Sequence, residues 1–298
     1  MSTETVPERA TPTHPPFRTA LISTAGHCAV ACGFCFRTDR AHGFLDIATF
    51  TRALSRLKEI GVEGVCLTGG EPTHHPELRQ LVRLAHQFGM PVSVVTSART
   101  SAEVTRLAEV SHLLTNVTVS ADSAGAMRLG RTTRSVASGV SVLAEIETPV
   151  RVLHLTYWQV MAEECREIHQ LLSDKDINIQ LSPVTFDEKA RTREALSLDA
   201  YVRQHRADAD LLGRYIRLSP RFQEHLVALR AMQLYPERQH PCRSAALYVS
   251  SGGELRRCPY SRSGVPVHAP RSDVASFLAR GTQDWTTPDC AAICRADT

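Results

Sequence analysis

Residues 64–89, GVCLTGGEPTHHPELRQLVRLAHQFG, join a short apolar run to a helical pattern through a glycine-containing turn. The run at 64–69 has the composition of a buried strand, and residues 75–89 repeat apolar side chains at helical spacing. A strand followed by a helix is one βα unit, and repeated units predict a parallel sheet. The turn between them then lies at the carboxyl end of its strand, where such sheets carry their chemistry.

The same alternation occurs six times along the chain and predicts an α/β fold. We expect strands near 18–23, 64–69, 92–97, 116–122, 150–157 and 177–183. Amphipathic helices are expected at 46–61, 75–89, 101–110, 134–146 and 162–176. Right-handed crossovers would curl six units into a closed or partly closed barrel, or leave an open doubly wound sheet.

Changes in composition divide the chain into four parts. Residues 1–16 are rich in Pro and Thr, and we expect them to form a flexible tail. The βα units occupy residues 17–184, and a helical connection is expected at 185–241. Residues 242–298 are punctuated by Cys, Gly and Pro, which predicts a small second module.

Composition excludes several classes of protein. The 298 residues are 43% hydrophobic and 22% charged, and the net charge of +3 is dispersed, so nothing calls for nucleic acid or a membrane as partner. No apolar run approaches the roughly 18 residues of a membrane span, and the N-terminus lacks the basic and apolar regions of a signal peptide. We therefore expect a cytoplasmic protein whose nine cysteines stay reduced.

Three cysteines follow the first expected strand at the spacing C-x3-C-x2-C: Cys28, Cys32 and Cys35. Three thiolates can bind three irons of a cubane iron–sulfur cluster and leave the fourth iron open. A structural zinc site would need a fourth ligand, which this loop lacks. Three inert buried cysteines at this spacing would be a coincidence.

These residues resemble the signature of radical S-adenosylmethionine (SAM) enzymes, in which an aromatic residue, here Phe34, precedes the last cysteine. A second motif is similar to the family's loop that contacts the methionine amino group of SAM: Gly69, Gly70, Glu71 and Pro72. The resemblance covers residues 17–184 and implies a partial (β/α)6 barrel. It also implies a 4Fe-4S cluster whose open iron binds SAM, a 5′-deoxyadenosyl radical, and an external one-electron reductant such as flavodoxin or ferredoxin.

Weaker matches place further cofactor contacts along the barrel. Ser97 lies where the family has a polar turn, and Ser120 and Asp122 resemble residues that approach the SAM ribose or methionine. An arginine often meets the SAM carboxylate in the next segment; Arg131 fits best, with Arg128 and Arg134 as rivals. Polar strand ends and helix caps are the alternative explanation for all of these residues.

Substrate contacts are expected near the ends of the fifth and sixth strands, at His154, Thr156, Tyr157 and Gln180. Alternation puts His154 and Thr156 on one face of their strand and Tyr157 on the other. The sequence does not decide which face is the inner one.

The late cysteines, with Gly253 between the first two, resemble the hairpin of SPASM and twitch domains: Cys242, Cys258, Cys290 and Cys294. The resemblance implies a second, fully ligated 4Fe-4S cluster. Zinc is the alternative, although only the last pair has the usual zinc spacing. A full SPASM domain needs seven cysteines, and only four remain here.

The resemblance implies oxidation of an alcohol in a sugar or aminocyclitol of antibiotic biosynthesis, with the second cluster as electron acceptor. Three alternatives stay open: an epimerase that uses Cys66 or a late cysteine as hydrogen donor, a peptide maturase, and an iron–sulfur binding or regulatory protein without catalysis. Cys66 and Cys165 otherwise suit small core residues.

Overall fold

The computed structural model describes residues 19–28, 30, 32–35, 43–184, 197–218, 220, 222–223, 247–257, 259 and 263–279. The expected N-terminal tail lies outside the described residues, and so does the whole expected ligand set of the second cluster: Cys242, Cys258, Cys290 and Cys294.

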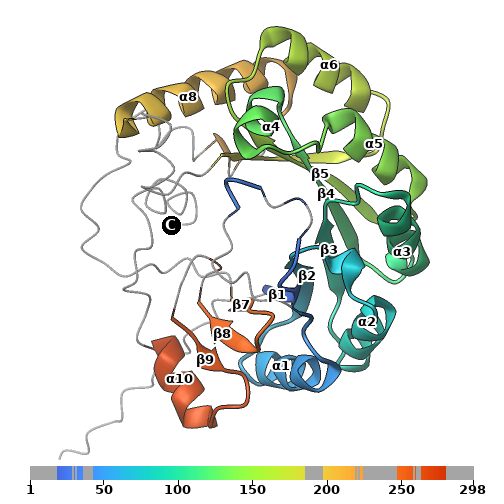
Figure 1. Cartoon of the computed structure of the whole chain (residues 1–298), viewed down its shortest axis with the longest axis vertical. Coiled ribbons are helices and arrows are strands. Elements are labelled where there is room, and N and C mark those ends of the chain that lie inside the picture. Colours follow the sequence, from blue (N-terminus) through green and yellow to red (C-terminus); the bar gives the residue numbers. More distant parts are fainter. Residues whose placement is uncertain are drawn as a thin grey trace, which may run out of the picture.

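Six parallel strands in chain order form a curved sheet (Figure 1). They are β1 (Thr19–Ala25), β2 (Gly64–Gly69), β3 (Val92–Thr96), β4 (Asn116–Asp122), β5 (Val150–Tyr157) and β6 (Asn178–Pro183). Every predicted strand is present, with ends that differ by at most two residues. The fold is therefore the predicted α/β partial barrel, with all six carboxyl ends on one side.

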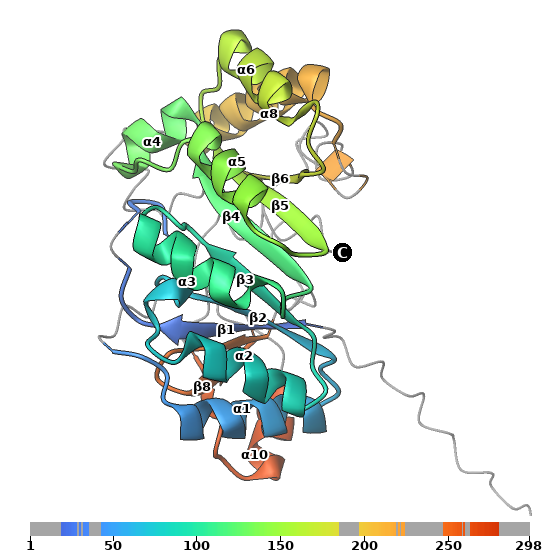
Figure 2. The ribbon, with the colours of Figure 1, turned by 90° about the vertical axis from the view of Figure 1, so that its right-hand side faces the viewer.

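The predicted helices cover the outer, convex face of this sheet (Figures 1 and 2). They are α1 (Ile47–Glu59), α2 (Leu78–Gln87), α3 (Ser101–Ser111), α5 (Val136–Glu145) and α6 (Ala162–Leu172). Side-chain caps explain several starts: Asp46 accepts from the Thr49 amide, and Thr100 and Glu103 form a capping box. Two short elements were not predicted, η1 (Pro72–His74) and α4 (Ala124–Gly130).

The two faces of the sheet differ in polarity. Leu67, Val94 and Leu153 are fully buried in the core that the helices cover. Each such side chain stabilises the fold by about 1.5–3 kcal/mol relative to an exposed one. The neighbouring strand residues point to the inner face, where Thr68 and Thr118 replace apolar side chains. The inner face is therefore where a polar ligand fits.

The described C-terminal residues extend the barrel sheet. β7 (Tyr248–Val249) pairs in parallel with β1, and β8 (Glu254–Arg256) and β9 (Val265–Pro266) follow antiparallel. The expected hairpin around Gly253 is present, with φ of 78° at that glycine. This part of the predicted 242–298 module thus continues the barrel through β1, and α10 (Arg271–Ala279) follows it.

A long helix, α8 (Leu198–Tyr215), packs against α6 at the other end of the sheet (Figure 2). It lies within the predicted helical connection. None of the helices in the described ranges is long and apolar enough to cross a membrane.

Candidate functional site

A cavity of about 550 Å³ lies on the inner face of the sheet, toward the carboxyl ends of the strands. It brings together residues from the first cysteine loop and from all six strands or the loops that follow them. Many of the predicted site residues line it: Cys28, Cys32, Phe34, Cys35, Gly69, Gly70, Glu71, Ser97, Ser120, His154, Thr156 and Gln180.

The three thiols line this cavity without forming disulfides. Cys32 is buried, and the Cys35 amide donates to the Cys32 carbonyl at 3.1 Å, which closes a tight turn. Burial raises the pKa of the Cys32 thiol to about 12, against the lowering effect of the Arg134 charge. Within the described ranges no three His, Cys, Asp or Glu side chains converge closely enough to hold one metal ion. Three thiols around one cavity fit a multi-iron cluster better than a single zinc ion.

Gly69 to Pro72 form the GGEP loop, which lies directly against the start of the cysteine loop, the segment after β1 that carries Cys28, Cys32 and Cys35. The Gly70 amide donates to the Ala25 carbonyl at 2.6 Å, and the Glu71 amide donates to the His27 carbonyl at 3.1 Å. A Cβ on Gly70 would lie 1.6 Å from the His27 oxygen, and Gly69 has φ of 119°. Both positions therefore require glycine, because the two backbones pack without room for a side chain.

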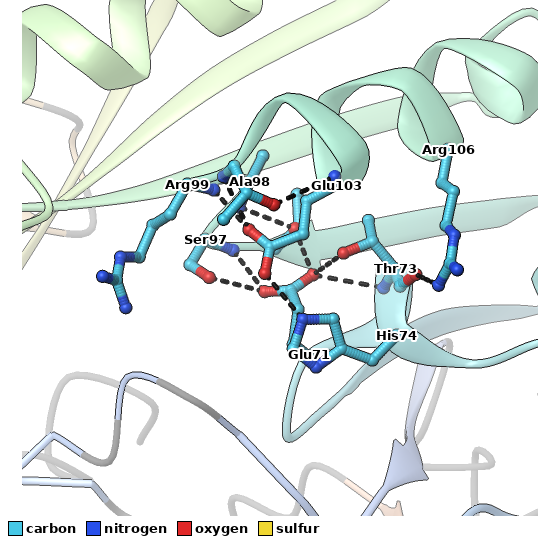
Figure 3. Close-up of polar contacts among 10 residues, drawn as sticks. Glu71, Thr73, His74, Ser97, Ala98, Arg99, Glu103 and Arg106 are labelled. Atoms are coloured by element: carbon cyan, nitrogen blue, oxygen red, sulfur yellow. Dashed lines mark hydrogen bonds and ion pairs between the residues drawn. The ribbon is translucent and has the colours of Figure 1, made fainter.

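The Glu71 carboxylate is fully engaged inside the protein (Figure 3). It accepts hydrogen bonds from the amides and hydroxyls of Thr73 and Ser97, and from the Thr96 hydroxyl. Ser97 donates from its hydroxyl at 2.6 Å. These bonds fix the GGEP loop to the end of β3, so Glu71 is a positioning residue whose side chain is buried. Pro72 is buried at the start of η1 and does not line the cavity.

A second carboxylate, Glu103 of α3, supports η1, which follows the GGEP loop (Figure 3). Glu103 lies 2.6 Å from His74 Nε2 and accepts from the amides of Arg99 and Thr100. Burial alone would raise the pKa of Glu103, but these hydrogen bonds lower it below its ordinary value. The Arg106 guanidinium donates to the Thr73 carbonyl at 2.9 Å. The sequence reasoning missed this support, although the T-x-x-E capping pattern at 100–103 was a usable signal.

The arginine assignment needs correction. Arg131 is exposed and ends α4 in the left-handed conformation with φ of 54°, and Arg128 is exposed as well. Arg134 is the one of the three that lines the cavity. The buried Asp122 holds it through two hydrogen bonds of 2.6 and 2.8 Å, and Asp122 also accepts from the Thr132 hydroxyl. Asp122 therefore orients Arg134 and does not itself line the cavity.

The substrate predictions divide by strand face. His154 and Thr156 of β5 and Gln180 of β6 line the cavity, and His154 Nε2 lies 2.8 Å from the Ser182 hydroxyl. Tyr157, also expected as a substrate contact, does not line the cavity, because alternation along β5 turns its side chain to the other face. Its hydroxyl lies 2.7 Å from Nδ1 of His205, a residue of α8.

The two lone cysteines do not line the cavity. Cys66 shares the inner face of β2 with Thr68, one layer farther from the strand end. Burial raises the pKa of its thiol to about 11. Cys165 is buried within α6, and burial raises its pKa to about 11 too. Both thiols are therefore neutral at physiological pH.

Replacing Glu71 tests its positioning role. Glu71→Gln turns one acceptor oxygen into an amide donor that faces protein donors, so we expect the free energy of unfolding to fall by about 1–3 kcal/mol. Urea denaturation measures this change. Glu77→Gln is the matched control, because Glu77 is exposed and its side chain makes no cap bond. Equal stabilities of the two variants would contradict the role of Glu71.

His154 predicts a pH effect. Burial, followed by the Arg134 charge, lowers its pKa to about 4, whereas an unfolded histidine titrates near 6.5. The unfolded chain binds more protons between these values, so this contribution to stability is lost as pH falls from about 7 to 4. In urea denaturation, His154→Gln should reduce the free energy of unfolding that is lost between pH 7 and 4 by ~1–3 kcal/mol. The exposed His169→Gln should keep the wild-type slope, and an unchanged slope in H154Q would refute the assignment.

Comparison with known proteins gives an independent result. A model described as the Radical SAM superfamily matches residues 22–137. An S-adenosylmethionine-dependent nucleotide dehydratase from a Thermoplasmatales archaeon is 35% identical over 97 residues, which are 33% of this chain and 33% of that protein. A PqqA peptide cyclase from Ruegeria pomeroyi is 35% identical over 82 residues, 26% of this chain and 22% of that protein. The chain thus matches a third or less of the length of these relatives.

The fold is also found among solved structures. The structure of native anSMEcpe with bound AdoMet superposes with a TM-score of 0.58 at 12% identity, and covers 89% of this chain and 84% of that chain. At this identity the likeness concerns the fold. The matched family segment contains the cysteine loop, the GGEP loop and β2 to β4, all in the arrangement described above. Residues 22–137 of this chain are thus similar to the radical SAM superfamily.

Proposed function

We propose that the chain is a radical SAM enzyme that acts on a polar substrate within the barrel. The observation that carries the proposal is the shared lining of one cavity by three thiols, two loop glycines and a wall of polar side chains. Cys28, Cys32 and Cys35 would hold a 4Fe-4S cluster, with one iron left for SAM. When bound, cluster and SAM supply a 5′-deoxyadenosyl radical, which removes hydrogen from an unactivated carbon.

The GGEP loop and Arg134 suit the ammonium and carboxylate groups of the methionine part of SAM. The Gly70 and Glu71 amides already donate to Ala25 and His27, so the GGEP loop offers its backbone carbonyl oxygens to an ammonium group. Arg134 keeps donors beyond the two that Asp122 occupies, since a guanidinium has five N–H groups. We assign the SAM carboxylate to Arg134, and the SAM ribose to the side of the cavity lined by Ser120.

The opposite wall suits hydroxyl groups. His154, Gln180 and Ser182 offer neutral donors and acceptors there, because burial keeps the imidazole uncharged at pH 7. Uncharged polar groups bind alcohols without the cost of leaving a buried charge unpaired. This supports oxidation of an alcohol in a sugar or aminocyclitol. The alcohol carbon gives one hydrogen atom to the radical, the hydroxyl loses a proton, and one further electron leaves to give a ketone.

Such an oxidation needs an acceptor for one electron besides SAM. The proposed ligands of that acceptor are Cys242, Cys258, Cys290 and Cys294, a set large enough for one fully ligated 4Fe-4S cluster. A soluble reductant such as flavodoxin or ferredoxin would deliver the first electron.

Peptide modification is the second candidate. The local similarity to a PqqA peptide cyclase favours it, whereas the hydrogen-bonding side chains on one wall of the cavity favour a small hydroxylated molecule. An epimerase would return hydrogen to the substrate carbon from a thiol, and neutral Cys66 on the inner face of β2 is the candidate donor.

The first test is SAM cleavage by the full chain, reconstituted anaerobically with iron and sulfide and reduced with dithionite. We expect 5′-deoxyadenosine and about eight irons per chain, four for each cluster. Cys32→Ala should abolish cleavage and remove about four irons. The control Cys165→Ala replaces a buried cysteine outside the cavity and should retain both. No cleavage by the wild-type chain would refute the enzyme, and zinc with about four irons would refute the second cluster.

The second test separates the reactions. In D2O with a panel of cyclitols and sugars, the oxidation yields a ketone two hydrogens lighter than the substrate, with no deuterium on the oxidised carbon. Deuterium on the product carbon without net oxidation would reject the oxidation in favour of epimerisation, and Cys66→Ala should then stop the incorporation. Turnover of peptides alone would favour the maturase.

A further inference from the structure

The second half of the cysteine loop docks on the end of α4. Gly33 and Phe34 are the two residues inside the Cys32–Cys35 turn, and both contact this helix. The Gly33 amide donates to the Gly130 carbonyl at 3.2 Å. The Phe34 ring covers the Gly130 Cα so closely that a Cβ there would lie 2.2 Å from Phe34 Cε1 and 2.9 Å from Cδ1.

Conformational strain does not explain a glycine at position 130. Its φ is not in the left-handed region, in contrast to Gly69 or Gly253. It is also the last residue of α4, where its backbone is still helical and alanine is the better helix former. The contact with Phe34 is therefore the structural reason for a glycine here.

The helix itself is held firmly at both ends. At its start the Ser123 hydroxyl donates to the Trp158 carbonyl and accepts from the Trp158 amide, and the Ala124 amide donates to Glu164 at 2.6 Å. A Cβ on Gly125 would lie 1.9 Å from the Trp158 oxygen, so α4 packs directly on the end of β5. At its other end Thr132 bonds to Asp122 of β4. The helix is thus a rigid support.

We propose that Gly130 and the end of α4 form a socket that sets the positions of Cys32 and Cys35, with Gly130 as a positioning residue. The inference rests on the proposed function, in which these thiols hold the cluster. The GGEP loop fixes the Cys28 end of the same loop through His27, so the two supports act on different cysteines. Because Phe34 both fills the socket and lines the cavity, filling position 130 displaces the ring and the turn that carries it.

The test uses four variants of the full chain: G130A, F34L, G130A/F34L and G252A. Gly252 is the matched control, because a Cβ there meets only the Ser250 hydroxyl at 3.8 Å. One readout is iron per chain after anaerobic reconstitution. The other is the rate at which iodoacetamide modifies Cys32 in metal-free protein, followed by mass spectrometry with Cys165 as internal reference.

We expect G130A to lose about four irons per chain. Its Cys32 should react about tenfold faster, as when overpacking shifts a local opening equilibrium. G252A should match the wild type, and G130A/F34L should restore both values because the shorter side chain makes room. The wild type, G130A, F34L and G130A/F34L form a double-mutant cycle in which the Gly130 and Phe34 effects are not additive.

Wild-type values in G130A would overturn the socket, and so would failure of the double variant to restore them. If G130A does not fold, the double variant decides: a folded, iron-loaded G130A/F34L supports the socket, and an unfolded one rejects it. If the wild-type chain binds no iron, the proposed function fails, while Cys32 labelling still tests the socket.

Discussion

The site depends on one backbone contact, the approach of Gly70 to the His27 carbonyl. The Gly70 amide bonds there to Ala25 at the end of β1, and the Glu71 amide bonds to His27 of the cysteine loop. No side chain fits between the two segments. The contact joins the end of β2 to the loop after β1, so the first thiol takes its position from the sheet. The buried Glu71 carboxylate then holds the GGEP loop against β3, and Glu103 holds η1 through His74.

The sheet explains why the remaining residues meet these loops. Parallel strands place all their carboxyl ends on one side, so β1 to β3 bring the loops and β4 to β6 bring the polar wall. Arg134 stands between the two halves and is the cavity-lining cation whose buried partner is Asp122. Burying an ion pair costs desolvation, and two hydrogen bonds in a fixed fork offset part of that cost. What the pair provides is a fixed direction for the guanidinium.

Much of this could be predicted because local signals were strong. β2, β4 and β5 have their predicted bounds, since each is a β-branched or apolar run ended by a turn or helix cap. The cysteine loop was found from its spacing, and the GGEP loop from its resemblance to a family motif. Three features could not be predicted. Period-two alternation gives faces but not which one is inner, so Tyr157 was misplaced. Arg131 and Arg134 are three positions apart, and the left-handed conformation of Arg131, which ends α4, has no clear signal in the sequence. The pairing of β7 with β1 joins distant parts of the chain and has no local signal.

The cysteine loop is supported from both halves of the barrel, and this has a physical consequence. One support is the GGEP loop after β2, and the other is α4 after β4. A loop held at one end alone would leave the positions of its thiols variable. Three ligands on such a flexible segment lose conformational entropy when they bind a cluster. Two backbone supports pre-order the loop and reduce that loss. Since Phe34 belongs both to the α4 contact and to the cavity lining, the seating of the thiols and the shape of the cavity are set by the same side chain.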